Sequence, residues 1–114
     1  MKKELLILLL VIAMAPLVQV RFSDEYIKQG SEFEVHARVI NELKSDMDNI
    51  RIRAVIPELG VMFTTGNFDV EDKSSESRFL HWDTKGYPKG DYLIKIVTSN
   101  EDFANVKYRY LTIY

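Results

Sequence analysis

The 114-residue sequence contains no cysteine. This absence excludes disulfide bonds, thiolate catalysis, cysteine-ligated zinc and iron–sulfur clusters. The sequence also has no excess of basic charge, because its formal net charge is -2 and acidic and basic residues are mixed along the chain. Without a basic stripe to neutralise a row of phosphates, we do not expect nucleic-acid binding.

Motifs for catalysis are missing as well. The sequence has no G-x-S-x-G element and no glycine loop that would cradle a phosphate. No carboxylate lies in an apolar context that would raise its pKa, as a general acid requires. We therefore expect a protein that is not an enzyme and that needs no cofactor.

Residues that could ligate a metal are few and poorly spaced. His36 and His81 are the only histidines, and nothing with metal-ligand spacing joins them. Asp46-Met47-Asp48 begins like a calcium loop, but Pro57 stands where such a loop needs a bidentate glutamate. Asp69, Glu71 and Asp72 would add carboxylates only if their segment folds nearby. We expect solvated turns and no metal.

The first fifteen residues differ in character from the rest. Lys2 and Lys3 precede an unbroken apolar run of eleven residues, Leu5 to Ala15. This run has the length of a signal-peptide core and is shorter than the roughly 20 residues of a membrane-spanning helix. Residues 1–15 are thus predicted to be a signal peptide, although Pro16 disfavours cleavage after Ala15, or a short membrane anchor; a buried helix or strand is the remaining alternative. Either targeting role places residues 16–114 outside the cytoplasm, with membrane contact only through an uncleaved segment.

From Leu17 onward the apolar residues follow a period of two, which is typical of half-buried strands. Turn residues separate eight such segments, at 18–22, 33–39, 50–56, 61–65, 68–70, 78–82, 92–97 and 106–114. Polar connections are expected at 41–49 and 71–77. Seven or eight strands at intervals of about ten residues predict one all-β domain, residues 16–114, folded as an immunoglobulin-like antiparallel β-sandwich.

The alternation also predicts the core of this sandwich. Its expected members are apolar residues of the inward faces: Phe33, Val35, Val39, Ile50, Ile52, Trp82, Tyr92, Ile94 and Ile96. Tyr92 follows Gly90 at the start of a strand. A tyrosine in such a position packs its ring inward and bonds its hydroxyl to nearby backbone.

Three stretches resemble immunoglobulin-like modules of cell envelopes. The stretch from Tyr26 to Asn41 is similar to the pattern V-x-x-G-x-x-F-x-V-x-V-x-V-x-N, and Asn49 to Gly60 is similar to the strand that follows it. Pro88 to Ile96 resembles P-x-G-x-Y-x-I-x-I. Together they resemble the CARDB-like and archaeal S-layer-associated domains. The resemblance implies cell-surface placement and a scaffolding or adhesive role.

Tyr108, Tyr110 and Tyr114 alternate along the last predicted strand and therefore share one face. They either cover the sandwich core or form an interaction surface, since aromatic side chains anchor protein interfaces and stack on sugars. We accordingly expect a non-enzymatic exported module that acts in protein–protein assembly, adhesion or surface-layer structure. The alternatives are a small carbohydrate-binding domain and a secreted accessory or chaperone-like binding protein.

Association is expected to run through an edge strand, either with a protein partner or with a second copy. The segment Val106 to Tyr114 is β-prone, aromatic and free of proline. An open edge of this kind exposes unpaired backbone groups that pair with another strand. Alternatively, the segment is central in its sheet, or Lys107 and Arg109 protect it.

Overall fold

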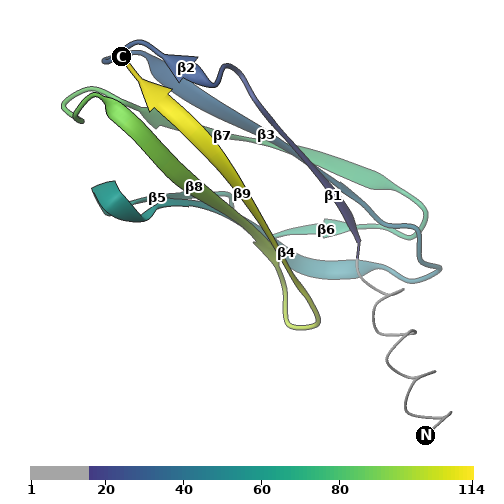
Figure 1. Cartoon of the computed structure of the whole chain (residues 1–114). Coiled ribbons are helices and arrows are strands. Elements are labelled where there is room, and N and C mark those ends of the chain that lie inside the picture. The colour runs from purple at the N-terminus through teal and green to yellow at the C-terminus, as the bar shows by residue number, and fades with distance from the viewer. Residues whose placement is uncertain (1–15) are drawn as a thin grey trace, which may run out of the picture.

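The computed structural model describes residues 16–114, so the predicted targeting role of residues 1–15 lies outside the described residues. The described chain folds into two β-sheets packed face to face (Figure 1). Its one helical element is a single 3-10 turn, η1 (Pro57–Leu59). Within residues 16–114 no helix has the length and apolar character needed to span a bilayer.

The smaller sheet has three antiparallel strands. Their order is β1 (Leu17–Phe22), β3 (Glu32–Ile40) and β7 (Ser75–Asp83). Both β1 and β7 pair with β3 alone, so each is an edge strand.

The larger sheet has six strands. Its main path runs β2 (Tyr26–Ile27), β9 (Ala104–Ile113), β8 (Gly90–Ser99), β4 (Met47–Ile56) and β5 (Val61–Thr64), and β6 (Phe68–Val70) pairs with β4. The predicted all-β sandwich is therefore confirmed. The structure adds a ninth strand, the two-residue β2.

The core lies between the two sheets and contains the inward-facing residues of both. All nine residues predicted for it are buried, among them Phe33, Ile50 and Ile94 with no exposed surface. The predicted tie of Tyr92 is confirmed, because its hydroxyl donates to the Pro88 carbonyl at 2.7 Å. A Cβ at Gly90 would lie 3.2 Å from that hydroxyl, which explains glycine there.

The strand pairing departs from the prediction in one place. β2 runs parallel to β9, with Tyr26 opposite Thr112 and Ile27 opposite Ile113. The chain leaves the smaller sheet after Phe22 and joins the larger one while keeping its direction, so it meets β9 running the same way. The sandwich is antiparallel everywhere else.

Two predicted polar connections were too long. β4 already begins at Met47, which is buried and pairs with Val70. The register shifts between Met47 and Ile50, where Asn49 has a φ of 56°, and this bulge interrupts the alternation. β7 begins at Ser75 instead of residue 78. Its first residues are polar because this end of an edge strand lies at the surface.

Asn41 joins two of the loops at one end of the sandwich. It is 1% exposed. Its Nδ2 lies within hydrogen-bond distance of the carbonyls of Ser45 (2.8 Å), Val70 (3.1 Å) and Glu71 (3.2 Å). Its Oδ1 accepts the Leu43 N–H at 3.0 Å. One amide therefore satisfies the backbone of both loops.

Candidate interaction surface

The outer face of the larger sheet carries the two predicted tyrosines Tyr108 and Tyr110. Residues directly opposite in antiparallel strands share a face, so the register identifies their neighbours. Leu93 lies opposite Tyr110, and Lys95 lies opposite Tyr108. We call this surface the tyrosine face; its members from β9, β8, β4 and β5 are Val106, Tyr108, Tyr110, Leu93, Lys95, Val97, Arg53, Val55 and Met62.

Large apolar side chains on the tyrosine face are open to solvent. Tyr110 is 74% exposed, Tyr108 55% and Met62 62%. The alternative that these tyrosines cover the core is thus wrong. Tyr114 is also exposed but is separated from them, because Thr112 intervenes and its hydroxyl bonds the Asp91 carboxylate at 2.6 Å.

Positive charge accompanies these apolar residues. Arg51 and Arg53 point to the outer face from β4, and Lys95 does so from β8, diagonally across from Arg53. Asp91 of β8 and Asp69 of β6 also point to the outer face; Asp91 accepts a hydrogen bond from the Thr112 hydroxyl and Asp69 accepts one from the Asn49 N–H. Within residues 16–114 neither arginine forms an ion pair. The face therefore combines aromatic surface with unneutralised cations.

A polar hollow of about 530 Å³ adjoins the tyrosine face. It is lined by Asn49, Arg51, Arg53, Asn67, Ser99, Asn100 and Glu101. Arg51 is held in place there, because its Nε donates to Asn67 Oδ1 at 3.1 Å. No sequence motif predicts this hollow, although the spacing of Arg51 and Arg53 places both on one face of a strand.

The edge of β9 is largely open. β2 pairs only with Thr112 and Ile113, so residues 104–111 have no neighbouring strand on that side. Thr112 and Tyr114 donate their N–H groups toward the β2 side. Because backbone groups alternate in direction along a strand, the N–H and C=O groups of Tyr108 and Tyr110 also point to the open side. The alternative that this strand is central is wrong for these residues.

One outward carbonyl on this edge has a partner from its own chain. The Arg109 guanidinium donates to the Tyr108 carbonyl at 2.9 Å. Arg109 and Lys107 lie on the same side of β9 as Leu111 and Ile113, but Lys107 is only half-buried and Arg109 is exposed. Both charges therefore line the open edge next to the free backbone groups.

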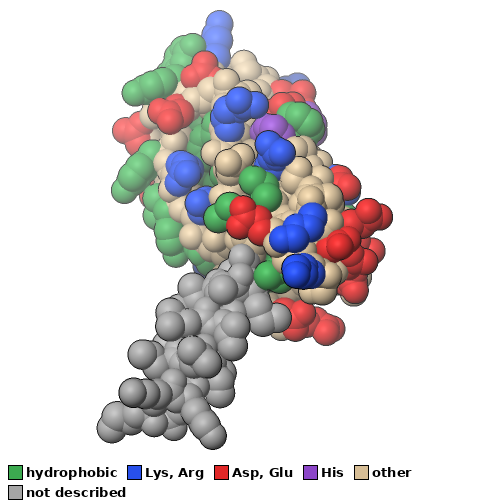
Figure 2. Space-filling model, turned by 90° about the vertical axis from the view of Figure 1, so that its right-hand side faces the viewer, with side chains coloured by type: hydrophobic (Ala, Val, Ile, Leu, Met, Phe, Trp, Pro, Cys, Tyr) green, Lys and Arg blue, Asp and Glu red, His purple; other side chains and the backbone are tan. Residues whose placement is uncertain are grey.

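The outer face of the smaller sheet differs in chemistry. It carries both histidines of the sequence. His36 stacks on Phe79 with ring centroids 4.5 Å apart. His81 Nδ1 lies 3.0 Å from Glu32 Oε1 and 3.3 Å from Glu34 Oε2. Figure 2, which views the molecule from the right-hand side of Figure 1, shows basic side chains scattered among acidic, hydrophobic and other ones. The outer face of the smaller sheet combines these polar groups with the exposed Phe79 and Leu17.

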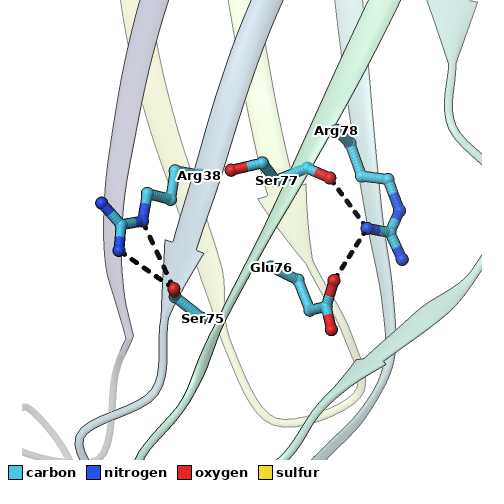
Figure 3. A network of polar contacts seen from close by, with 5 residues as sticks. All are labelled: Arg38, Ser75, Glu76, Ser77 and Arg78. Atoms are coloured by element: carbon cyan, nitrogen blue, oxygen red, sulfur yellow. Dashed lines mark hydrogen bonds and ion pairs between the residues drawn. The ribbon is translucent and has the colours of Figure 1, made fainter.

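The edge strand β7 is also protected by an arginine. Arg78 donates to the Ser77 carbonyl at 2.8 Å and pairs with Glu76 at 3.1 Å, while Arg38 bonds the Ser75 hydroxyl (Figure 3). The Arg78 guanidinium also lies 4.3 Å from the Phe68 ring centroid. Arg78 is therefore held by three groups at once.

The carboxylates considered for a metal are used in other ways. Asp46 Oδ1 accepts the Asp72 N–H at 2.9 Å, and Asp69 Oδ1 accepts the Asn49 N–H at 3.0 Å. Among residues 16–114 no group of three or more histidine, cysteine or acidic side chains is arranged to hold a metal ion.

Solved structures share this architecture. The CARDB domain of a Pyrococcus furiosus protein, in complex with di-metal ions, superposes with a TM-score of 0.67 at 15% identity, covering 88% of this chain and 90% of the other. A solution structure of the same domain gives 0.63 at 16% identity, covering 87% and 95%. This chain has the fold of a CARDB domain.

The CARDB-like fold also occurs inside larger proteins. The alkylpurine DNA glycosylase AlkC of Pseudomonas fluorescens, bound to DNA containing an abasic site analogue, matches at 6% identity with a TM-score of 0.63, covering 95% of this chain but 33% of the enzyme. No family model and no curated protein matches the sequence. At these identities the comparisons show the fold alone.

Proposed function

We propose that this CARDB-like chain is a non-enzymatic, extracytoplasmic module that assembles with a protein partner through the tyrosine face. The observation that carries the proposal is the exposure of Tyr108, Tyr110 and Met62 on one continuous sheet face. Exposed aromatic residues rimmed by cations are enriched at interfaces. The CARDB neighbours, which match over almost their whole length, support a binding module in preference to a catalyst.

The contrast between the two outer faces supports this location. The tyrosine face has aromatic and aliphatic surface with Lys95 and Arg53 and no free acid in the register. The other outer face exposes Phe79 and Leu17 but sets them among polar side chains that contact one another, such as His81 with Glu32 and Glu34. A docking partner gains more from covering exposed apolar surface than from covering polar groups that already have partners.

Crosslinking in cells of the source organism tests the proposal. A photo-reactive amino acid replaces Tyr110 in the full chain, and a matched variant carries it at Ser77 on the opposite outer face. We expect a specific protein crosslink from position 110 and none from position 77. Equal crosslinking at both positions, or none at 110, would refute docking through the tyrosine face.

A reporter fused after Phe22 tests the proposed export. A reporter that stays in the cytoplasm would contradict it.

Carbohydrate binding is a second candidate because of the polar hollow. Arg51, Asn67 and Asn100 offer guanidinium and amide donors at the end of the sheet that carries the tyrosine face, and such donors suit sugar hydroxyl and carboxylate groups. Affinity electrophoresis in gels containing acidic or neutral polysaccharides tests it. Retardation of the parent that is lost in Arg53→Gln and Tyr108→Ala would favour this candidate.

A further inference from the structure

The open edge of β9 presents different chemistry on its two sides. Tyr108 and Tyr110 project to the outer face, while Lys107 and Arg109 project to the other side. Between them, the backbone groups of Tyr108 and Tyr110 point outward from the edge. A strand added here would form main-chain hydrogen bonds and place its alternate side chains against either the tyrosines or the cations.

A second copy of β9 is a poor occupant of this edge. In an antiparallel pair related by a two-fold axis, the outward-pointing residues must lie opposite one another. Centring the pair on Tyr108 brings Lys107 of each copy opposite Arg109 of the other. Centring it on Lys107 or on Arg109 brings that residue opposite its own copy. Like charges directly opposite destabilise a sheet, which disfavours these registers. A register centred on Val106 avoids them but pairs only residues 104–108, and one centred on Tyr110 needs the Thr112 N–H, which already bonds the Glu25 carbonyl.

We infer that the β9 edge accepts an extended segment of a protein partner that carries carboxylates at alternate positions, with apolar residues between them. Side chains directly across two strands share a face, so carboxylates two residues apart lie opposite Lys107 and Arg109. The intervening apolar side chains then lie against Tyr108 and Tyr110. The inference rests on the proposed function in that the partner is a protein.

Arg109 has a double role in this arrangement. In the free chain its guanidinium covers the Tyr108 carbonyl at 2.9 Å, which protects the edge from unselective pairing. A carboxylate on the incoming strand is a stronger acceptor than a carbonyl, because charge-assisted bonds are about twice as strong as neutral ones. The guanidinium turns to the carboxylate, and the carbonyl becomes free to accept an N–H from the incoming strand.

The same role is not open to Arg78 on the β7 edge. Arg78 covers the Ser77 carbonyl but is also paired with Glu76 and stacked on Phe68. An incoming carboxylate would have to displace Glu76 and break the ring contact. Of the two long edges that an arginine covers, β9 is therefore the one that an acidic strand opens.

Two labelled ten-residue peptides test the inference with the full-length protein. In one, glutamate alternates with valine, and in the other lysine replaces each glutamate; fluorescence anisotropy gives their affinities. We expect the glutamate peptide to bind at least about tenfold more tightly, and Lys107→Glu/Arg109→Glu to reverse the preference, since tenfold corresponds to about 1.4 kcal/mol. Equal binding of both peptides, or an unchanged preference in the charge-reversed variant, overturns the inference.

A proline variant tests whether the backbone of the edge is used. Tyr110→Pro removes an outward N–H without removing a bond to β8, and Tyr110→Ala removes the same side chain but keeps that N–H. Both variants lose the Tyr110 side chain, so we expect Tyr110→Ala to weaken binding of the glutamate peptide and Tyr110→Pro to abolish it, with both folds checked by circular dichroism. Binding that survives in a folded Tyr110→Pro protein overturns the inference. If that variant does not fold, the charge-reversed variant still decides.

The outcomes separate this inference from the proposed function. A crosslink from position 110 in cells, together with no peptide preference, would leave the protein-binding face in place and overturn strand addition. Dimers of the parent that disappear in Tyr110→Pro would show that a second copy occupies the edge, which also overturns the inference.

Discussion

Replacing Asn41 perturbs two loops through a single buried side chain. Asn41→Ala removes the amide that approaches the carbonyls of Ser45, Val70 and Glu71 and that accepts the Leu43 N–H. The amide has two donor hydrogens, so three short contacts represent two hydrogen bonds with one of them shared. Adding the acceptor bond gives about three hydrogen bonds, each worth about 1 kcal/mol net.

The expected loss for Asn41→Ala is therefore about 2–4 kcal/mol in the free energy of unfolding. For a domain of about 100 residues this lowers Tm by roughly 4–8 °C per kcal/mol. Asn67 provides a matched control, because it is an exposed asparagine whose Oδ1 accepts one bond from Arg51. Asn67→Ala is expected to change stability by no more than about 0.5 kcal/mol.

Asn41→Asp adds a pH dependence that the alanine variant lacks. The new carboxyl faces three carbonyl oxygens, which favour its protonated form, so its pKa in the folded state is raised above the unfolded value of about 3.9. Relative to Asn41→Ala, the Asn41→Asp variant is then most stable below the unfolded-state pKa of its new carboxyl. It loses stability as the pH rises through the folded-state pKa. Urea denaturation of both variants, repeated about every pH unit from pH 3 to 8, measures their free energies of unfolding. A loss below about 1 kcal/mol for Asn41→Ala, or no relative pH trend for Asn41→Asp, would refute the role assigned to this amide.

Four further substitutions test the core and its polar groups. Ile94→Ala, at a side chain with no exposed surface, should cost about 2–5 kcal/mol in urea denaturation, and a cost below about 1 would contradict its central place. Tyr92→Phe removes the bond to the Pro88 carbonyl and should lower stability by about 1 kcal/mol in thermal unfolding. Thr98→Val should leave stability unchanged or raise it by up to about 1 kcal/mol, because the buried Thr98 Oγ1 has no hydrogen-bond partner among the described atoms; a clear loss in calorimetry would reveal a bond at that hydroxyl. Tyr110→Ala should change Tm little, since the side chain is exposed, and a large drop would indicate packing that the structure does not contain.

Period-two alternation was sufficient to predict the sandwich and its core. In β3 and β4 one side of the strand is apolar and the other polar, so Phe33 and Ile52 could be assigned to the interior from sequence. The ends of β4 and β7 were harder, because a bulge at Asn49 breaks the alternation and Ser75 begins a strand with polar residues. β2 has only two residues, too few for any pattern.

The orientation of the tyrosines could not be predicted for a physical reason. Along β9, Leu111 and Ile113 share their side with Lys107 and Arg109, so each side of the strand carries large apolar residues. Only the last residues of the strand are buried. The first half of β9 has a neighbouring strand on one side only, and which side faces the interior follows from its register against β8, where Tyr92, Ile94 and Ile96 are buried. That information lies in tertiary structure and not in the local sequence.

The crossing of the first segment from one sheet to the other also determines how the domain resists mechanical force. β2 and β9 run parallel, and three backbone bonds join their segments: Thr112 N–H to Glu25, Tyr114 N–H to Ile27, and Gln29 N–H to Tyr114. Tension that pulls β2 toward its N-terminal end and β9 toward its C-terminal end loads these bonds in shear. They must then break together and not one after another, whereas a β9 with an antiparallel neighbour would be peeled open from one end. We therefore expect the domain to resist tension applied between the N-terminal end of β2 and the C-terminal end of β9.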